Sequence, residues 1–521
     1  MRRQDIQLLV SARHGDVAAR CEVGRRYLLG VDGFPRHVAT GFEHLTHESV
    51  RELPQAARII AEHVALEEIL QHGHQRTLER AAAAGSPIAH LKLGVIALVL
   101  ERRLDAAREH FGAAAAQRSE AAQHALDALG GAAAKLDAGT VTATLRALDA
   151  DGVVAGATIA MLGALRAREA GDLEALCDNV QSAYDLAGPA APAELSELVV
   201  AAVRMAETLG RPLRGIAPQH VRESLEMHAN KGDRDAAYAL GRGLCGLANP
   251  ALGDAVFAGQ QNMRKGAAYL LRAADAGCDP AWLHLYRLHS DHRLSVANPQ
   301  LARYFLEKAA ARDQPEAQRM LGALLLREAA SLADSEQAIQ WLHLAALQGD
   351  AHARELLHSL VLPVAGDDDE AADAAIEQLR ADHPWLAARL DVARHFGLTK
   401  LEALCFDPVE GLRPWGLVVG KNPFISQIRL SAPRAIPAPS ERAQEAARRA
   451  AALFEQARGD ALSIEGDLRR RSLRQRRVFE KHMLDESTFF ADATASELDA
   501  LRLGPKWAFR ARESLSLALG A

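Results

Sequence analysis

The sequence is poor in aromatic residues. Only 5% of its 521 residues are Phe, Trp or Tyr, although 49% are hydrophobic, so most of the apolar content is Ala, Leu and Val. Stretches such as "RAQEAARRAAALFEQAR" are strong helix formers. The composition therefore predicts an all-α protein, and the length is sufficient for two or more domains.

Cysteines and long hydrophobic runs are also scarce. The five cysteines lie far apart and form no C-x-x-C, which is typical of reduced thiols in a cytosolic protein. No run of 18 apolar residues occurs, and the apolar stretch before Arg13 is too short for a signal peptide. We therefore expect a location in a cytoplasm of the bacterial type, with no membrane partner.

Neither a strong net charge nor a catalytic motif is present. The net charge is −6, which gives no global attraction for nucleic acid or an anionic membrane. No P-loop, H-E-x-x-H or G-x-S-x-G motif occurs, and the 21 histidines do not have the spacing of a metal site. The sequence thus predicts a protein that is not an enzyme and has no cofactor or metal.

One glycine pattern imitates a dinucleotide-binding fingerprint. "ALGRGLCG" places Gly241, Gly243 and Gly246 in the order G-x-G-x-x-G. The pattern follows a predicted helix rather than a strand, and no βαβ unit surrounds it. We interpret Gly241 as a packing glycine between helices and the other two as loop glycines.

What the sequence has instead is a repeat. Three stretches within residues 266–358 place a small residue first, then an aromatic three positions later, a leucine, an Ala pair, a turn residue and a further alanine. The last alanines are 36 residues apart in both steps, and copies of the template recur upstream. The alanines that anchor the copies are Ala19, Ala56, Ala89, Ala122, Ala236, Ala281, Ala317 and Ala353.

Each copy predicts two antiparallel helices. Small residues let the helices approach closely, while the aromatic and the leucine fill the space between neighbouring copies. The turn residues Gly277, Asp313 and Gly349 suit the left-handed conformation that ends a helix. Because one pair cannot bury its own apolar face, the pairs are expected to stack into a solenoid.

The repeats resemble the Sel-like repeat (SLR) family, which is related to tetratricopeptide repeats. The stretches "ARHGDVAARCEVGRRYLLGVDG" and "AIQWLHLAALQGDAHARELL" match its pattern best. The resemblance implies a right-handed α-solenoid of stacked helix pairs that assembles other proteins. Secreted members of the family often carry paired cysteines in each repeat, and their absence here supports an intracellular member.

The repeats divide the chain into four predicted parts. Residues 1–130 and 220–362 hold the SLR helix pairs, and residues 131–219 form an irregular helical middle that either continues the stack or joins two halves of it. Residues 363–521 are expected to form a separate, mostly helical domain.

The last part contains the chain's only convincing strand signals. "WGLVV" and "FISQIRL" flank "GKNP", which predicts a β-hairpin near residues 414–430. We expect the Pro-rich segment from Pro433 to Pro439 to be a linker or extended arm. A helix near residues 440–483 follows, with Ser440 as its N-cap.

That helix carries the one strong local charge bias. Seven basic residues stand against Glu480 alone: Arg469, Arg470, Arg471, Arg474, Arg476, Arg477 and Lys481. Such a cluster is consistent with contact to nucleic acid or to an acidic partner. A solvated helix face, paired with acidic residues elsewhere, is the other interpretation, and the lack of aromatics among the arginines favours it.

An insertion marks a second candidate surface. Thirty residues separate Ala236 from Gly266, whereas the two following repeats have 21 in the same interval. The extra residues lie in the 249–265 loop, which either contacts a partner or is a neutral surface insertion.

These features favour a non-catalytic scaffold or adaptor that binds one or more proteins along the solenoid. We expect partners on the concave face and at the 249–265 loop. Trp282 and Tyr286 are candidate exposed aromatics there, with packing between repeats as the alternative. The second hypothesis is a nucleic-acid-linked regulator that uses the Arg-rich helix, and no residue pattern supports an active site.

Overall fold

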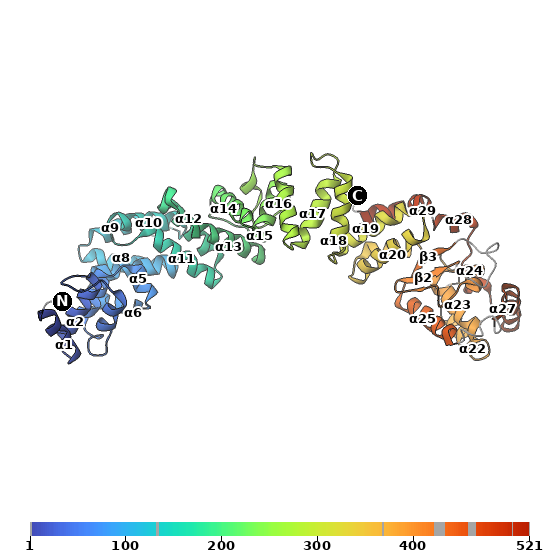
Figure 1. Cartoon of the computed structure of the whole chain (residues 1–521), viewed down its shortest axis with the longest axis horizontal. Helices are drawn as coiled ribbons and strands as arrows, with labels where there is room; N and C mark the ends of the chain where they lie inside the picture. Colours follow the sequence, from blue (N-terminus) through green and yellow to red (C-terminus); the bar gives the residue numbers. More distant parts are fainter. Residues whose placement is uncertain are drawn as a thin grey trace. The chain divides into compact units, whose positions relative to one another are not determined.

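The computed structural model describes residues 3–131, 135–366, 369–420, 433–456, 465–502 and 504–519. Backbone contacts divide the chain into two compact units, Met1–Cys278 and Asp279–Ala521. Both units are predominantly helical, and a small sheet lies in the second (Figure 1). The four-part division of the chain at residues 130, 219 and 362 stays a prediction.

The first unit consists of successive helices that pack on their neighbours along the chain. Two short 3-10 turns, at Gly188–Ala190 and Asp254–Phe257, and one π-helical turn, at Ile96–Leu100, interrupt it. Its α-helices are α1 (Arg3–Arg13), α2 (Val17–Leu29), α3 (Val38–Leu45), α4 (Pro54–His63), α5 (Leu66–Gln71), α6 (Gln75–Ala83), α7 (Pro87–Val95), α8 (Leu104–Ala116), α9 (Glu120–Leu129), α10 (Ala138–Ala150), α11 (Gly156–Ala170), α12 (Leu173–Ala187), α13 (Ala193–Leu209), α14 (Pro218–Asn230), α15 (Arg234–Leu244) and α16 (Met263–Asp275).

The second unit continues with helix pairs and ends in a different arrangement. A three-stranded sheet and further helices follow the last pair. Its elements are α17 (Asp279–Ser290), α18 (Pro299–Ala310), α19 (Pro315–Glu328), α20 (Leu332–Leu347), α21 (Ala351–His358), α22 (Asp369–Asp382), α23 (Pro384–Phe396), α24 (Lys400–Cys405), β1 (Leu412–Arg413), β2 (Gly416–Val419), β3 (Arg434–Pro437), α25 (Glu441–Gln456), α27 (Leu468–His482), a 3-10 turn (Glu486–Thr488), α28 (Ala495–Ala500), α29 (Gly504–Arg510) and α30 (Arg512–Leu519).

One capping device recurs before the anchor alanines. An Asp or Ser three residues earlier accepts a hydrogen bond from the alanine backbone N–H, which satisfies a donor left free in the first turn of the helix. The eight anchor alanines are all buried. The capped pairs are Asp16–Ala19, Ser86–Ala89, Ser119–Ala122, Asp233–Ala236 and Asp350–Ala353, and the decayed copy in the middle of the chain has the same cap, Asp172–Ala175.

The turns and the close crossings follow the repeat as predicted. Gly277, Asp313 and Gly349 have φ values of +91°, +55° and +94°, so all three adopt the left-handed conformation. A Cβ at Gly241 would lie 2.9 Å from the backbone N of Leu270 in the next helix. Gly241 is therefore a packing position between α15 and α16, which confirms the interpretation made from the sequence.

The sheet joins two hydrophobic cores of the second unit. Strands β1, β2 and β3 are antiparallel in that order, with Leu417 opposite Ile436. Because side chains alternate along a strand, Leu417 and Ile436 enter a core with α22, α23 and α25. Val418 and Ala435 enter the other core, with α19, α20 and α21. The sheet thus connects the last helix pairs directly to the helices that follow.

Of two strand predictions, the hairpin stays a prediction and the linker after it needs correction. The predicted strand at 415–419 exists as β2, but its described partners are β1 and β3; the proposed second strand at 424–430 lies outside the described residues. The segment after Pro433 is not a linker, because Arg434–Pro437 forms the buried strand β3. Ala435 and Ile436 enter the two cores, and the charge of the buried Arg434 is paired with Glu402. The prolines around the strand concealed it in the sequence.

The predicted helix near 440–483 is also not continuous. Ser440 caps α25 as expected, accepting a hydrogen bond from the backbone N–H of Ala443 at 3.1 Å. Gly466, with φ +73°, then turns the chain, and Asp467 caps the separate helix α27. The Arg-rich segment therefore belongs to its own helix.

Candidate interaction surfaces

The 249–265 loop packs against the first unit over part of its length. Ala251, Leu252 and Val256 are buried. The backbone N–H of Leu213 donates to the Ala251 carbonyl at 2.6 Å, and Arg222 donates to the Val256 carbonyl at 2.6 Å. The loop therefore connects the segment before α14 with α14 itself, and only its outer residues face solvent.

Phe257 fixes the loop against α15. A Cβ at Gly243 would lie 2.1 Å from the Phe257 ring, so only glycine admits that ring at this position. Gly246 has φ +65° and turns the chain out of the helix. All three glycines of the "ALGRGLCG" pattern thus have a role in packing or in a turn.

A groove runs beside this loop. It has a volume of about 260 Å³ and is bounded by α14, α15, the loop and the start of α16. Leu240, Leu244 and Phe257 are its apolar floor, and all three are buried. Its polar wall comprises Gln219, Arg222, Glu223, Glu226, Gln260, Asn262 and Lys265. Lys265 and Glu226 form an ion pair across it at 2.6 Å.

A second hollow of about 340 Å³ lies at the turn between α14 and α15. Asn230 is its most connected side chain, since its carbonyl oxygen accepts from the Tyr269 hydroxyl at 3.1 Å and from Arg272 at 3.2 Å. Asp233, which also lines it, pairs with Arg204 at 2.6 Å. Its polar groups are thus engaged with one another, as is the Gln219 amide on the groove wall, which donates to Glu223 at 2.8 Å.

The candidate aromatics of α17, Trp282 and Tyr286, are less exposed than the sequence predicted. Trp282 is only 4% exposed and packs edge-on against Tyr304 and tilted against Phe305 of α18. Its placing on an exposed face is therefore wrong, and packing between helices explains it. Tyr286 is half-buried, and burial raises the pKa of its hydroxyl.

The exposed aromatic of this region is one that sequence reasoning missed. Tyr304 is 46% exposed, and the Lys308 ammonium lies 5.3 Å from its ring centroid. It directly precedes Phe305, the repeat aromatic that the pattern assigned to the core. Adjacent residues of a helix are rotated by about 100°, so Tyr304 points away from the face that buries Phe305. Its position next to the repeat aromatic could therefore have predicted its exposure.

The Arg-rich helix α27 has two faces. Arg471 is 7% exposed and donates to the Leu404 carbonyl at 2.9 Å and the Gly466 carbonyl at 3.1 Å, so it is a structural residue rather than a surface contact. Arg474 is half-buried, and its charge helps to lower the pKa of Glu465. The remaining cations are exposed: Arg469, Arg470, Arg476, Arg477 and Lys481.

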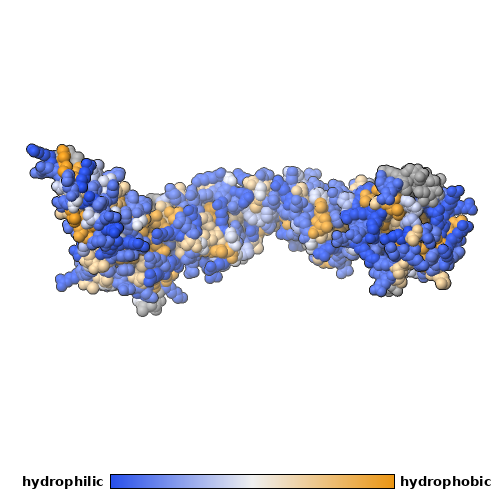
Figure 2. Space-filling view, turned by 90° about the horizontal axis from the view of Figure 1, so that it is seen from below, coloured by the Kyte–Doolittle hydropathy of each residue, from blue (hydrophilic) through white to orange (hydrophobic). Residues whose placement is uncertain are grey.

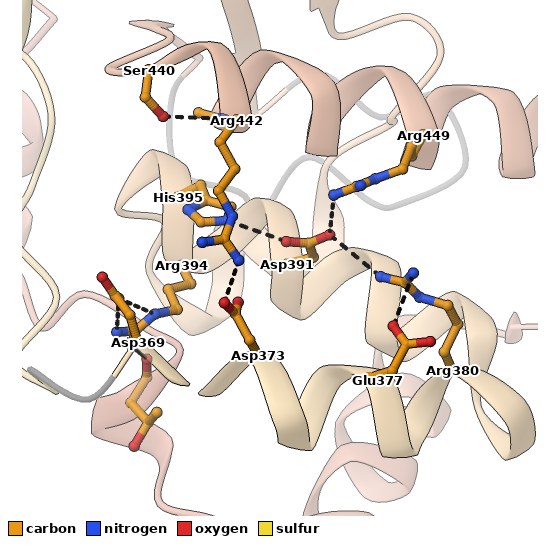
Figure 3. A network of polar contacts seen from close by, with 12 residues as sticks. Asp369, Asp373, Glu377, Arg380, Asp391, Arg394, His395, Ser440, Arg442 and Arg449 are labelled. Carbon is orange, nitrogen blue, oxygen red and sulfur yellow. Dashed lines mark hydrogen bonds and ion pairs between the residues drawn. The ribbon is translucent and has the colours of Figure 1, made fainter. Parts of the chain in front are cut away.

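Helices α22, α23 and α25 are joined by a polar network (Figure 3). The buried Asp391 carboxylate is its centre; it lies 3.2 Å from Arg449, 3.4 Å from His395 and 3.9 Å from Arg380. Burial alone would raise the pKa of Asp391, but the hydrogen bond and charge of His395 and the two arginines outweigh it, and the pKa is lowered. Arg442 pairs with Asp373 at the edge of the network.

Two more ion pairs are buried in the second unit. Arg434 is fully buried and binds the Glu402 carboxylate at 2.8 and 3.1 Å. Arg389 binds Glu465 through two bonds of 2.9 Å, and its guanidinium lies 4.8 Å from the Phe454 ring centroid. Because each carboxylate is saturated by arginine, these groups are suited to holding the fold rather than to proton transfer.

The surface shows little that resembles a catalytic or membrane site. No cluster of three or more His, Cys, Asp or Glu that could hold a metal is found among the described residues, and none of the helices described there is long and apolar enough to cross a membrane. On the face seen in Figure 2, hydrophilic residues predominate and hydrophobic residues form small separate patches.

No protein-family model and no curated protein matches the chain. Among solved structures, it is similar to c5321 of uropathogenic Escherichia coli, a protective antigen with an SLR fold. That structure has 18% identity and a TM-score of 0.27, with 68% of this chain and 74% of the other covered. It is also similar to a Sel1 repeat protein from Oxalobacter formigenes, with 18% identity and a TM-score of 0.25, covering 69% and 91%. Both are repeats of the kind that the sequence resembles.

Proposed function

We propose that the chain is a non-catalytic scaffold that binds protein partners on its helix pairs, with the groove beside the 249–265 loop as a recruiting site. The groove is the observation that carries the proposal. Its apolar floor and polar rim have the composition of a protein-binding surface, in which an apolar centre is surrounded by groups that can exchange hydrogen bonds.

The size of the groove favours a side chain over a cofactor. Pockets for cofactors and drug-sized ligands occupy roughly 300–1,000 Å³. At about 260 Å³ the groove is smaller than that range. It therefore fits one or two side chains of a bound polypeptide, anchored by Leu240, Leu244 and Phe257 and oriented by the amide of Gln260.

A cytoplasmic location is part of this proposal. No disulfide links any of the five cysteines, all of which lie within the described ranges. Burial raises the pKa of Cys177 and of Cys245 to about 12, which keeps both thiols protonated and unreactive. Such cysteines serve as small core residues and suit a reducing compartment.

Site-specific photocrosslinking tests the scaffold. A photoreactive amino acid is placed at Gln260, on the groove rim, in the full-length chain and expressed in the cells from which the gene comes. The matched control carries it at Arg76, an exposed residue of α6. The expected result is one or a few proteins crosslinked from position 260 and absent from position 76.

A charge-swapped variant tests whether the groove makes the contact. Glu226→Lys with Lys265→Glu preserves the ion pair of the rim but reverses the charges that a partner meets. Crosslinking from position 260 is expected to fall several-fold in this variant. Equal crosslinking from positions 260 and 76, or none from either, contradicts the groove as a recruiting site.

A further inference from the structure

Helix α27 presents one face to the protein and another to solvent. Arg471, Gln475, Val478 and Phe479 are buried, and their spacing of 4, 7 and 8 residues places them on one side of the helix. The opposite side consists of exposed residues: Arg469, Arg470, Leu473, Arg476, Arg477, Glu480 and Lys481. We call this side the α27 outer face.

The inner side holds the helix firmly in place. Arg471 bonds to the carbonyl oxygens of Gly466 and Leu404, and Gln475, which is fully buried, donates to Glu486 at 3.0 Å. Val478 and Phe479 belong to the core that holds α22, α23 and α25. The outer face is therefore displayed on a fixed element of the fold.

The cations of the outer face differ from other arginines of the same unit. Arg380, Arg394 and Arg442 each pair with a carboxylate, as Figure 3 shows. Arg413 and Arg449 do the same. By contrast, no described residue forms an ion pair with any of these four: Arg469, Arg470, Arg477 and Lys481. Within the described ranges, therefore, neighbouring acidic residues do not neutralise these four side chains.

The spacing of the cations also destabilises helix α27. Arg477 and Lys481 are four residues apart on the outer face. Like charges at this spacing lie side by side on a helix and repel one another. An anionic ligand would relieve that repulsion, so the face is complementary to negative charge.

An exposed leucine lies at the centre of the charge. Leu473 is 47% exposed, and a rotation of 100° per residue places Arg469 and Arg476 on one side of it and Arg470 and Arg477 on the other. Glu480 lies about two turns further along the same line. A large apolar side chain ringed by arginines matches a ligand that combines an apolar contact with carboxylates.

We propose that the α27 outer face is the docking site for an acidic segment of a partner protein, in which Asp and Glu flank a large apolar side chain. The apolar side chain contacts Leu473, and the carboxylates pair with the surrounding arginines in the bidentate geometry that guanidinium groups favour. This goes beyond the scaffold function and is independent of the groove in the first unit.

Two observations favour a protein over a nucleic acid. The outer face has no aromatic side chain on which a base could stack. An exposed leucine contributes nothing to phosphate binding but does contribute to a protein contact.

Fluorescence anisotropy with the full-length chain tests the proposal. The probe is a labelled helical peptide in which one leucine is surrounded by glutamates at i ± 3 and i ± 4, and the control peptide has glutamine in place of that leucine. Binding of the probe is expected to weaken about tenfold in Arg469→Gln with Arg477→Gln, and about fivefold in Leu473→Gln.

Arg448→Gln is the matched control. Arg448 is an exposed arginine of α25 in the same unit and outside the outer face, so its variant should bind the probe as the wild type does. The proposal is overturned if the probe does not bind, or if the control variant weakens binding as much as the outer-face variants. It is also overturned if duplex DNA of mixed sequence binds more tightly than the peptide while Leu473→Gln leaves DNA binding unchanged, which would assign the face to nucleic acid.

Discussion

The guanidinium of Arg319 in α19 donates a hydrogen bond to the carbonyl oxygen of Leu517 at 3.1 Å, and a further one to the carbonyl oxygen of Ala518. These carbonyls are at the end of α30, where a helix leaves acceptors without partners. Arg319 also pairs at 3.0 Å with Asp350, the N-cap of α21. One buried side chain therefore joins two helix pairs to the last described helix.

Arg319→Gln is expected to loosen α30. The substitution removes both carbonyl contacts and leaves the Asp350 carboxylate, which is mostly buried, without its cation. We expect a loss of about 3 kcal/mol in the free energy of unfolding and faster amide hydrogen exchange in residues 512–519. Arg312→Gln breaks an exposed pair with Asp279 and should change stability by about 0.5 kcal/mol or less. Unchanged exchange in α30 would refute this role for Arg319.

Gly243→Ala is expected to displace the 249–265 loop. The added methyl group would meet the Phe257 ring at 2.1 Å, so the ring must move and the loop with it. We expect a loss of about 2 kcal/mol, measured by urea unfolding, and partial recovery when Phe257→Leu is added.

Gly112→Ala provides the contrast for that substitution. Gly112 lies within α8, and nothing is within 4 Å of the position of its Cβ. Alanine should therefore stabilise the helix, by about 0.5–1 kcal/mol. Equal losses at the two positions would show that the contact with Phe257 is not the cause.

The Glu402–Arg434 pair predicts a dependence of stability on acid pH. Burial alone would raise the pKa of Glu402, but the Arg434 guanidinium and the hydrogen bonds from Thr399 outweigh it and lower the pKa below its ordinary 4.5. A lowered pKa in the folded state means that this stability is complete above pH 4.5 and is lost as the pH falls through the folded pKa.

Glu402→Gln should remove that dependence at a cost in stability. We expect about 3 kcal/mol lower free energy of unfolding at pH 7, with a smaller decline below pH 4.5 than in the wild type. Urea unfolding over a pH series measures both. Glu79→Gln, at an exposed position of α6, should leave the pH profile unchanged. An unaltered acid profile in Glu402→Gln would contradict the assignment.

Asp391→Asn tests the network that joins α22, α23 and α25. The neutral amide cannot pair with Arg449 and Arg380 at once, so we expect a loss of about 2–4 kcal/mol. Asp373→Asn breaks a more exposed pair with Arg442 and should cost less than about 1 kcal/mol. Thermal unfolding of both variants provides the comparison, and equal costs would show that the network is not centred on Asp391.

The repeat could be read from the sequence because it encodes local geometry. Anchor alanines such as Ala281 and Ala317 are buried, and Asp313 adopts the left-handed conformation that its place in the pattern predicted. Each of these features depends on residues within one helix pair or on its neighbour. A periodic sequence shows such contacts directly, since the same contact recurs at each step.

Contacts that occur only once in the chain leave no periodic pattern in the sequence. The burial of Trp282 depends on Tyr304 and Phe305 of the next helix, and a single sequence does not show which neighbour covers an aromatic. Likewise, Arg471 is one of six arginines that look alike in the sequence, and the carbonyl of Leu404 that holds it is 67 residues away. Only the folded structure therefore shows which arginines of α27 are structural and which are exposed.

Helices α29 and α30 cover an apolar face of the helix pairs in the second unit. Trp507, Leu515 and Ala518 share a core with Leu326 of α19 and Leu356 of α21, so the chain's own segment covers this face of the helix pairs. Because that segment is tethered to the face that it covers, its own effective concentration there is on the order of millimolar. An external ligand would have to compete with it. A substitution that releases α30 would thus expose this apolar face even as it lowers stability.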